Sequence, residues 1–90
     1  MAIYVDPIRK HPSGLWCHMM SDTGTEELVA FALSIGLKRE WIQKEGTRYE
    51  HFDLRPSMRA KAVQSGALDV SSVEMGRKCF KREVSSRDSP

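Results

Sequence analysis

The segment from Trp16 to Leu28 constrains the fold more than any other part of the sequence, because it joins an apolar strand to the start of a helix. Residues 16–20 carry apolar side chains on both faces of an extended chain, and His18 is the exception on its face. We therefore expect a central, largely buried strand. Polar groups follow directly after it, at the position where ligands commonly bind in open α/β sheets.

A helix is predicted over residues 24–35. Thr23 followed by Glu26 matches a capping box, in which each side chain bonds a backbone N–H at the helix start. Gly36 followed by Leu37 suits a Schellman ending, in which the glycine adopts a left-handed backbone and the next apolar side chain folds back onto the last turn. The apolar side chains that recur at helical spacing between these two ends are Leu28, Phe31, Ala32 and Ile35.

The rest of the chain supplies short strands and a second helix. Alternation and β-forming residues predict strands over 2–6, 40–43, 49–54 and 67–70, and Pro56 suits the first turn of a helix over 56–65. Proline and glycine predict a loop over 10–14. The element order predicts an α/β fold, a single small domain with a short sheet of about four to five strands covered by two helices. Strands linked by helices are expected to be parallel.

Composition limits the classes of protein to which the chain can belong. Its 90 residues, 40% hydrophobic and 29% charged, suit one globular domain, and no apolar run is long enough to cross a membrane. The first residues do not resemble a secretory leader, so we expect a cytoplasmic protein. A small core also favours a homo-oligomer. Cys17 and Cys79 lack the spacing of a structural zinc site or a disulfide framework.

Basic residues concentrate at the C-terminal end. Residues 1–75 contain nine basic and ten acidic side chains, whereas residues 76–90 contain five basic and two acidic ones. We expect an α/β domain over 1–75 and a basic, disordered tail over 76–90. Because the domain is nearly neutral, nucleic acid is not an expected partner except through the tail.

Basic and aromatic side chains suggest a first function, the binding of a small anionic ligand that is phosphorylated or nucleotide-like. Arg55 and Arg59 lie one helical turn apart near a helix start, where two cations are unfavourable unless an anion lies between them. Nearby acids or water that solvate the arginines are the alternative. The residues predicted to bind the ligand, through paired donors, the helix start or aromatic stacking, are Arg9, Trp16, His18, Thr23, Trp41, His51, Arg55 and Arg59.

Two histidines and an aspartate suggest a second function, a metal-dependent hydrolase. His51 and Asp53 share one face of a predicted strand, and His18 lies on the central strand. Together they offer the kind of ligand set that leaves a zinc or manganese position open for catalysis, with Asp6 or Asp22 as the base. In the structural alternative, His18 is a satisfied histidine of the sheet and Asp53 only orients His51.

A third function class is a non-catalytic oligomeric interaction subunit, in which aromatic and methionine side chains form an interface. Nucleophilic catalysis by Cys17 is a further possibility, and it would need His51 as the base because the adjacent histidine points to the opposite face. The two site hypotheses predict that five side chains converge on one concave surface. These are Arg9, His18, His51, Asp53 and Arg59.

Between positions 1 and 70 the sequence contains a series of uncommon residues in a characteristic order. They are Ile3-Tyr4-Val5-Asp6-Pro7 with Arg9, Cys17-His18-Met19 with Asp22, Glu27-Leu28, Phe31-Ala32, Ile35-Gly36, Trp41-Ile42-Gln43, His51-Phe52-Asp53, Arg59, Ala62-Val63 and Gly66-Ala67. In these residues the sequence resembles the uncharacterised family catalogued as domain of unknown function 4031, from bacteria and their phages. The resemblance implies no activity. In a phage setting it implies a module that sequesters a nucleotide signal.

Overall fold

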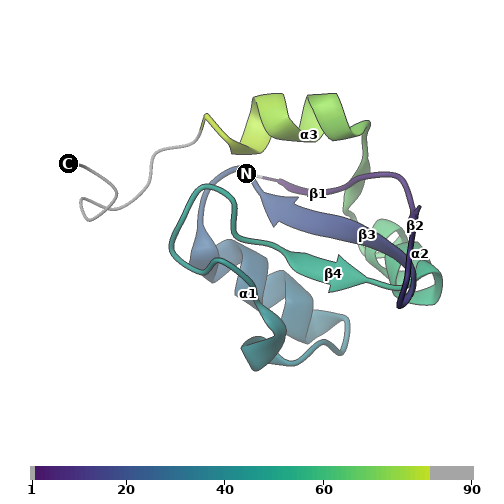
Figure 1. Ribbon diagram of the computed structural model, residues 1–90. Helices are drawn as coiled ribbons and strands as arrows, with labels where there is room; N and C mark the ends of the chain where they lie inside the picture. Colours follow the sequence, from purple (N-terminus) through teal and green to yellow (C-terminus); the bar gives the residue numbers. More distant parts are fainter. Residues whose placement is uncertain (1, 82–90) are drawn as a thin grey trace.

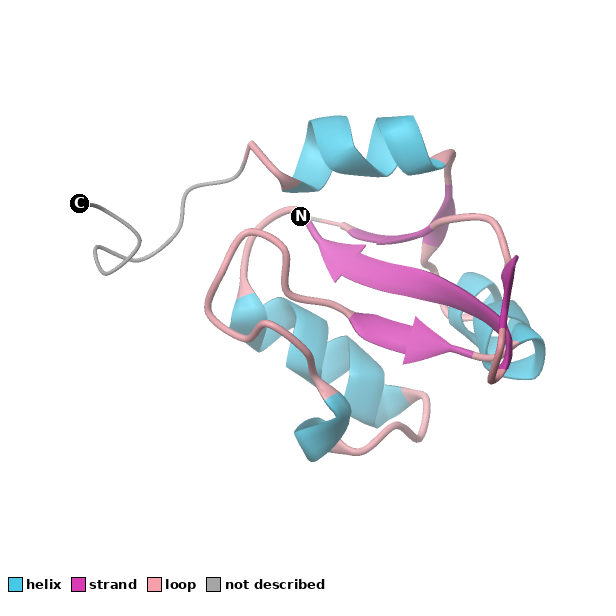
Figure 2. Ribbon diagram, in the orientation of Figure 1, coloured by secondary structure: helices cyan, strands magenta, loops and turns pink. Residues whose placement is uncertain are grey.

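The computed structural model describes residues 2–81. These residues form one β-sheet that is covered by helices on both faces (Figures 1 and 2). This confirms the predicted α/β class. No helix within these residues is long and apolar enough to span a membrane. The elements are β1 (Ile3–Val5), β2 (Arg9–His11), β3 (Gly14–Ser21), α1 (Thr25–Ser34), the short 3-10 helix η1 (Arg39–Trp41), β4 (Phe52–Leu54), α2 (Pro56–Gln64), β5 (Leu68–Asp69) and α3 (Ser72–Cys79).

β3 is the central strand, as its two apolar faces predict. β1 and then β2 pair antiparallel with one edge of β3, β4 pairs antiparallel with the other edge, and β5 lies parallel to β1. The expectation that helix-linked strands are parallel is therefore wrong for β3 and β4. After α1, residues 35–51 return to the end of the sheet where β3 finishes, so β4 runs back in the opposite direction (Figure 1).

The loop predicted over residues 10–14 is instead the tip of a β-hairpin. β2 pairs with the first residues of β3, so that only Pro12 and Ser13 form the turn. All three side chains of β2 are exposed and polar. The sequence pattern missed this strand because it has no apolar face that would produce alternation.

The main core lies between the sheet and the pair of helices α1 and α2. Its members are buried on the face of the sheet opposite to α3. Burial of a large apolar side chain contributes about 1.5 to 3 kcal/mol, so this layer supplies most of the stability. The side chains of this core with no exposed surface are Val5, Met19 and Phe52 from the strands and Leu28, Ala32 and Ala62 from the helices.

α3 covers the other face of the sheet, and the sequence did not predict it (Figure 1). Its buried residues Met75 and Cys79 pack against Tyr4 and Met20 in a second, smaller core. Residues 2–81 therefore contain three α-helices where two were expected. Because β1 and β3 are covered on this face only near Tyr4 and Met20, the remaining part of the face stays accessible.

The predicted boundary between the domain and the tail falls inside α3. The helix continues through position 75 to Cys79, which has no exposed surface. A local signal for this helix is present, since the Ser71 hydroxyl accepts a hydrogen bond from the backbone N–H of Glu74 at the helix start. The remainder of the predicted tail, residues 82–90, lies outside the described residues.

The two ends of α1 differ in how well the sequence predicts them. The Schellman ending is confirmed: Gly36 has a φ of +100°, and the Leu37 N–H donates to the Ala32 carbonyl oxygen at 3.0 Å. The capping box is wrong, because Gly24 precedes the helix and no side chain caps it. Thr23 instead donates its hydroxyl proton to a carboxylate one helical turn further on.

The chain between α1 and β4 contains less strand than predicted. The strand expected over 40–43 is the helix η1, and only Gln43 forms a β-bridge, with His51. The strand expected over 49–54 is shortened to β4, because residues 44–49 turn. This short bridge still matters, since it attaches the loop to the edge of the sheet next to the candidate site.

Replacing Gly66 with alanine is expected to lower the free energy of unfolding by about 1 to 2 kcal/mol, because a φ of +114° is costly for a residue with a Cβ. Crowding is not the cause, since no heavy atom lies within 4 Å of the added Cβ. Gly24→Ala is the matched control, because that site is equally open but extended, with a φ of 172°. Urea denaturation measures both variants, and equal stabilities would contradict this explanation.

Candidate functional site

His18 lies on the face of β3 that points away from the main core. Strand alternation places its neighbours Cys17 and Met19 in that core, so the imidazole faces the side of the sheet that carries α3. α3 packs over Tyr4 and Met20 but leaves 45% of the His18 side chain exposed. A buried strand therefore holds this histidine while its ring remains open to solvent.

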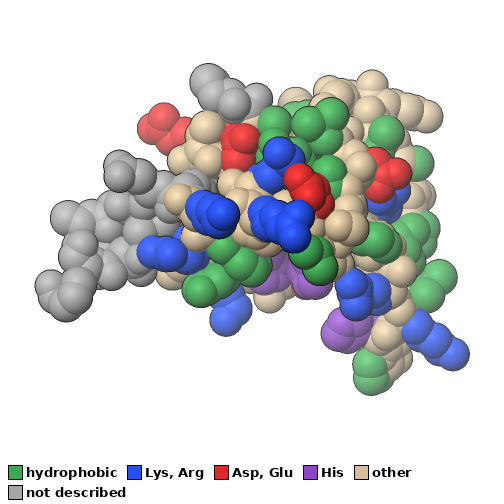
Figure 3. All heavy atoms as spheres, turned by 90° about the horizontal axis from the view of Figure 1, so that it is seen from above, with side chains coloured by type: hydrophobic (Ala, Val, Ile, Leu, Met, Phe, Trp, Pro, Cys, Tyr) green, Lys and Arg blue, Asp and Glu red, His purple; other side chains and the backbone are tan. Residues whose placement is uncertain are grey.

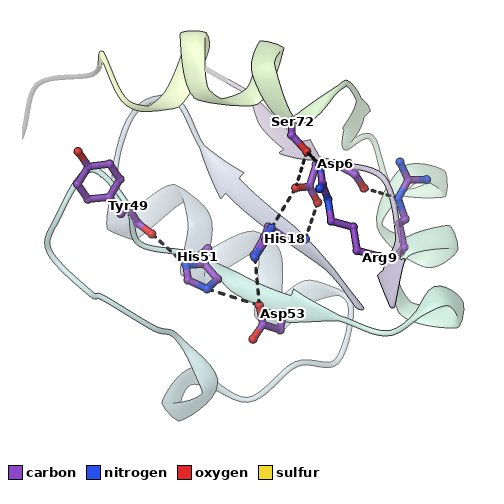
Figure 4. Close-up of polar contacts among 8 residues, drawn as sticks. Asp6, Arg9, His18, Tyr49, His51, Asp53 and Ser72 are labelled. Atoms are coloured by element: carbon purple, nitrogen blue, oxygen red, sulfur yellow. Dashed lines mark hydrogen bonds and ion pairs between the residues drawn. The ribbon is translucent and has the colours of Figure 1, made fainter. Parts of the chain in front are cut away.

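Asp6 fixes the orientation of the His18 ring. It is 3% exposed and lies in a bulge, where residues 6–8 stand opposite two residues of β3. One carboxylate oxygen accepts the backbone N–H of His18 at 2.7 Å, and the other accepts Nδ1–H at 3.0 Å. With Nδ1 as the donor in the neutral ring, Nε2 keeps its lone pair and points away from Asp6 (Figure 4).

The contact between Asp6 and His18 shifts both acid–base equilibria. The hydrogen bond to Asp6 raises the pKa of His18 above its usual value, against the lowering effect of partial burial. Burial acts to raise the pKa of Asp6, but the side-chain and backbone hydrogen bonds from His18 hold that pKa below its usual value. Each shift therefore favours the charged form of its group more than in an unpaired side chain.

His51 and Asp53 approach His18 from β4. The strand register places Asp53 directly opposite His18. His51 Nδ1 lies 3.0 Å from the main-chain carbonyl oxygen of Tyr49, which accepts its proton, and His51 Nε2 lies 3.5 Å from Asp53 Oδ1. His18 Nε2 lies 4.0 Å from the same oxygen, and the two imidazole rings meet edge to face with centroids 5.1 Å apart.

Gln43 holds the Asp53 carboxylate from the far side. Its amide donates a hydrogen bond to Asp53 Oδ2, and two backbone hydrogen bonds of 2.9 and 3.0 Å join Gln43 to His51. The other carboxylate oxygen, Oδ1, is thereby directed at the two histidines. One ligand atom from each of His18, His51 and Asp53 lies within 4.8 Å of the other two. We call these three residues the triad.

A cleft of about 560 Å³ opens beside the two histidines, between the sheet and α3. Arg9 enters it from β2 and donates a hydrogen bond to Ser72 of α3 (Figure 4). Lys44 and Tyr49 enter it from the loop before β4, and the Tyr49 ring packs on Phe80 at a centroid distance of 4.8 Å. From above, histidine surface is visible among basic and hydrophobic side chains (Figure 3).

The sequence matches one family model over residues 3–82, described as Protein of unknown function (DUF4031). The chain belongs to the DUF4031 family. This confirms the resemblance and extends it from residue 70 through α3, so the match includes every element of the cleft. No curated protein and no solved structure matches the chain. For this DUF4031 protein, function must be inferred from the site.

The structure separates the arginines that the sequence grouped around a phosphate. Arg9 lines the cleft, whereas Arg59 does not. Arg59 Nε donates to the main-chain carbonyl oxygen of Asp6 at 2.8 Å, and its Nη2 donates to Asp69 Oδ1 at 2.5 Å. Only 17% of the Arg59 side chain is exposed, so this arginine joins α2 to β1 and β5. Of the five side chains expected to converge, Arg9, His18 and His51 line the cleft. Asp53 lies next to it in the triad, and Arg59 stays apart from both.

Four other predicted ligand-binding residues also lie outside the cleft. Arg55 stacks on Trp16, with its guanidinium carbon 4.4 Å from the indole centroid, and both line a separate groove with Trp41. Thr23 lines neither hollow, because its hydroxyl is bonded to Glu27 at the start of α1. A single phosphate site built from the three arginines and the α1 start is therefore not formed.

The candidate bases and the candidate nucleophile also receive other roles. Asp6 orients His18, as described above, and Asp22 accepts hydrogen bonds from the Ala2 N–H at 2.8 Å and the Tyr4 hydroxyl at 3.3 Å, outside the cleft. Cys17 is 2% exposed, and burial raises the pKa of its thiol to about 11. At neutral pH this thiol is protonated and shielded, which excludes it as a nucleophile.

The sequence did not reveal several residues that shape the site, namely Gln43, Lys44 and Ser72. Gln43 and Lys44 lie in irregular chain, and their positions depend on the return of residues 35–51 to the sheet. Ser72 reaches Arg9 only because α3 folds over the sheet. The spacing of the serine and glutamate that start α3 was the one local signal for this wall of the cleft.

Asp6→Asn is expected to remove a pH-dependent part of the stability of the metal-free protein. The lowered pKa of Asp6 stabilises the fold fully above about pH 4 and ceases to do so in acid. The raised pKa of His18 stabilises it fully below about pH 6.5, and this contribution is lost as the pH rises through the folded-state pKa. The difference in unfolding free energy between wild type and variant should therefore peak between these values. Urea denaturation at several pH values tests this, and a pH-independent difference would argue against the charged pair.

Proposed function

We propose that this protein is a metal-dependent hydrolase of a small phosphorylated substrate, with zinc or manganese held by His18, His51 and Asp53. One observation carries the proposal: both histidines direct Nδ1 to an acceptor, so that both Nε2 atoms face Asp53 Oδ1. Metal-binding histidines commonly donate their second ring N–H to a carboxylate or a backbone carbonyl. Both types of acceptor are present here, in Asp6 and Tyr49.

The spacing of the triad supports a metal ion. In a tetrahedral zinc site with bonds of about 2.0 to 2.1 Å, ligand atoms lie about 3.4 Å apart. The two Nε2 atoms lie 3.5 and 4.0 Å from Asp53 Oδ1, and all three ligand atoms lie within 4.8 Å of one another, so the triad would have to contract around the ion. Three protein ligands leave a further position open, as catalytic metal sites require. Since both histidines line the cleft, that position would face it.

A metal in this position supplies the chemistry of hydrolysis. Its charge would lower the pKa of a bound water to about 7. Hydrolysis of a phosphate ester at this site would join the water oxygen to phosphorus, break the ester P–O bond and pass a proton to the leaving oxygen. No thiol nucleophile is needed, in agreement with the burial of Cys17.

Two cations in the cleft support an anionic substrate. Arg9 and Lys44 line it together with both histidines and are exposed. Residues 1–75 are nearly neutral in total, so this charge is local and favours a compact anion over a polyanion. The anion binding expected from the sequence becomes the first step of this reaction. Of the three arginines predicted to bind the anion, only Arg9 lines the cleft. If the site binds its ligand without hydrolysing it, the same site would sequester a nucleotide signal in phages.

Metal binding is the direct test. Wild-type protein stripped with a chelator is expected to bind one equivalent of Zn²⁺ or Mn²⁺ by calorimetry, and His51→Ala should weaken that binding by at least about tenfold. His11→Ala is the matched control, because His11 lies near the triad in a neighbouring hollow but is not part of it. Loaded wild type should then hydrolyse a member of a panel of phosphate esters. Failure to bind either ion, or equal losses in both variants, would contradict the proposal.

A further inference from the structure

A second hollow of about 510 Å³ lies beside the triad, and neither the family nor the proposed reaction accounts for it. Both tryptophans of the chain line it, and Trp41 is 51% exposed even though it is large and apolar. We call it the tryptophan groove. Its apolar and aromatic lining is Trp16, Leu37, Trp41, Leu54 and Met58.

Cations accompany both indole rings of the tryptophan groove. The Arg55 guanidinium lies over Trp16 at 4.4 Å, and the Lys38 ammonium lies 5.7 Å from the centroid of Trp41. Arg55 also lines the groove itself. An extended apolar surface over the groove would take these positive charges out of water, which is unfavourable. A small planar ring with polar edges can stack on the indoles and on the Arg55 guanidinium plane while the cations keep contact with water.

The tryptophan groove is continuous with the triad. Asp53 lines the groove, and its Oδ1 atom lies 3.5 and 4.0 Å from the Nε2 atoms of the two histidines. A smaller hollow of about 340 Å³ connects the two regions, since Trp16, Gln43 and Asp53 line it together with both triad histidines. A small molecule that follows these shared side chains would extend from the indoles towards the triad.

We infer that the tryptophan groove binds the base of a nucleoside monophosphate, whose phosphate extends towards the triad. The inference rests on the proposed function for the position of the phosphate, and on the groove alone for the base. Aromatic side chains and arginine planes are the surfaces on which bases stack. Gln43 and Ser57 line the same groove and offer hydrogen-bonding groups to the edge of a base.

The test uses the chain's own tryptophan fluorescence in metal-free protein. Because both indoles line the groove, a stacked base should quench their emission. Adenosine 5′-monophosphate, added in the presence of a chelator and excited at the red edge of the indole band, is expected to quench saturably. Ribose 5-phosphate, which has the phosphate but no ring, should not quench. Absence of saturable quenching, or equal quenching by both compounds, would overturn the inference without variants.

Variants assign the effect to the groove. Trp41→Leu should weaken the binding of adenosine 5′-monophosphate by at least about tenfold, measured by calorimetry so that the lost fluorophore does not matter. Phe80→Leu is the matched control, because it removes an exposed ring from the cleft and not from the groove. Circular dichroism checks that both variants fold. Unchanged affinity in Trp41→Leu, or an equal loss in Phe80→Leu, would overturn the assignment.

The same titration separates this inference from the proposed function. Wild-type protein is titrated with adenosine 5′-monophosphate in the presence of a chelator and, separately, with the metal ion, because the ring contact does not require the ion. Quenching without metal binding would support the groove and reject the metal centre. Metal binding without quenching would reject the groove alone. Concentration-dependent dimerisation that shields Trp41 and blocks quenching would overturn the inference in favour of a second copy.

Discussion

The structure of the site depends on Asp6, whose side-chain carboxylate replaces its own main-chain carbonyl as the acceptor for the His18 N–H. In a regular antiparallel ladder the His18 N–H would bond to the main-chain carbonyl opposite it. Here the Asp6 carboxylate accepts that N–H and the ring Nδ1–H as well, while the Asp6 carbonyl oxygen turns to accept Arg59 from α2. A single buried residue thus joins strand pairing, the main helical layer and the orientation of the imidazole. The carboxylate also lies 3.4 Å from the Ser72 hydroxyl of α3.

Local sequence patterns were sufficient for the central strand, the helix after it and its glycine ending. Alternation also placed His18 on the face opposite Cys17, and placed His51 with Asp53, because side-chain direction in a strand depends only on position. The meeting of the two groups depends on the β3–β4 register, in which Asp53 lies opposite His18. A slip of one residue would turn Asp53 to the other face, and no local pattern encodes that pairing across a long connection.

The failures have physical causes that differ from one element to the next. β2 has only exposed polar side chains, so its strand pairing leaves no hydrophobic period in the sequence. α3 buries just Met75 and Cys79, which is too few for a clear helical stripe in a basic segment. Arg59 looked available for an anion because its partners, the Asp6 carbonyl and Asp69, come from distant strands. The cytoplasmic location, the homo-oligomer and the phage setting stay predictions.

The bulge at residues 6–8 restricts where the chain can accept insertions and deletions. Three residues there span the distance that two residues span on β3. Deleting one of them would restore a regular ladder, yet it would withdraw the carboxylate that holds the imidazole. At the hairpin tip, by contrast, Pro12 and Ser13 form the whole turn beyond the last paired residues. Insertions are therefore tolerable at the tip, while the segment between β1 and β2 admits neither gain nor loss of a residue.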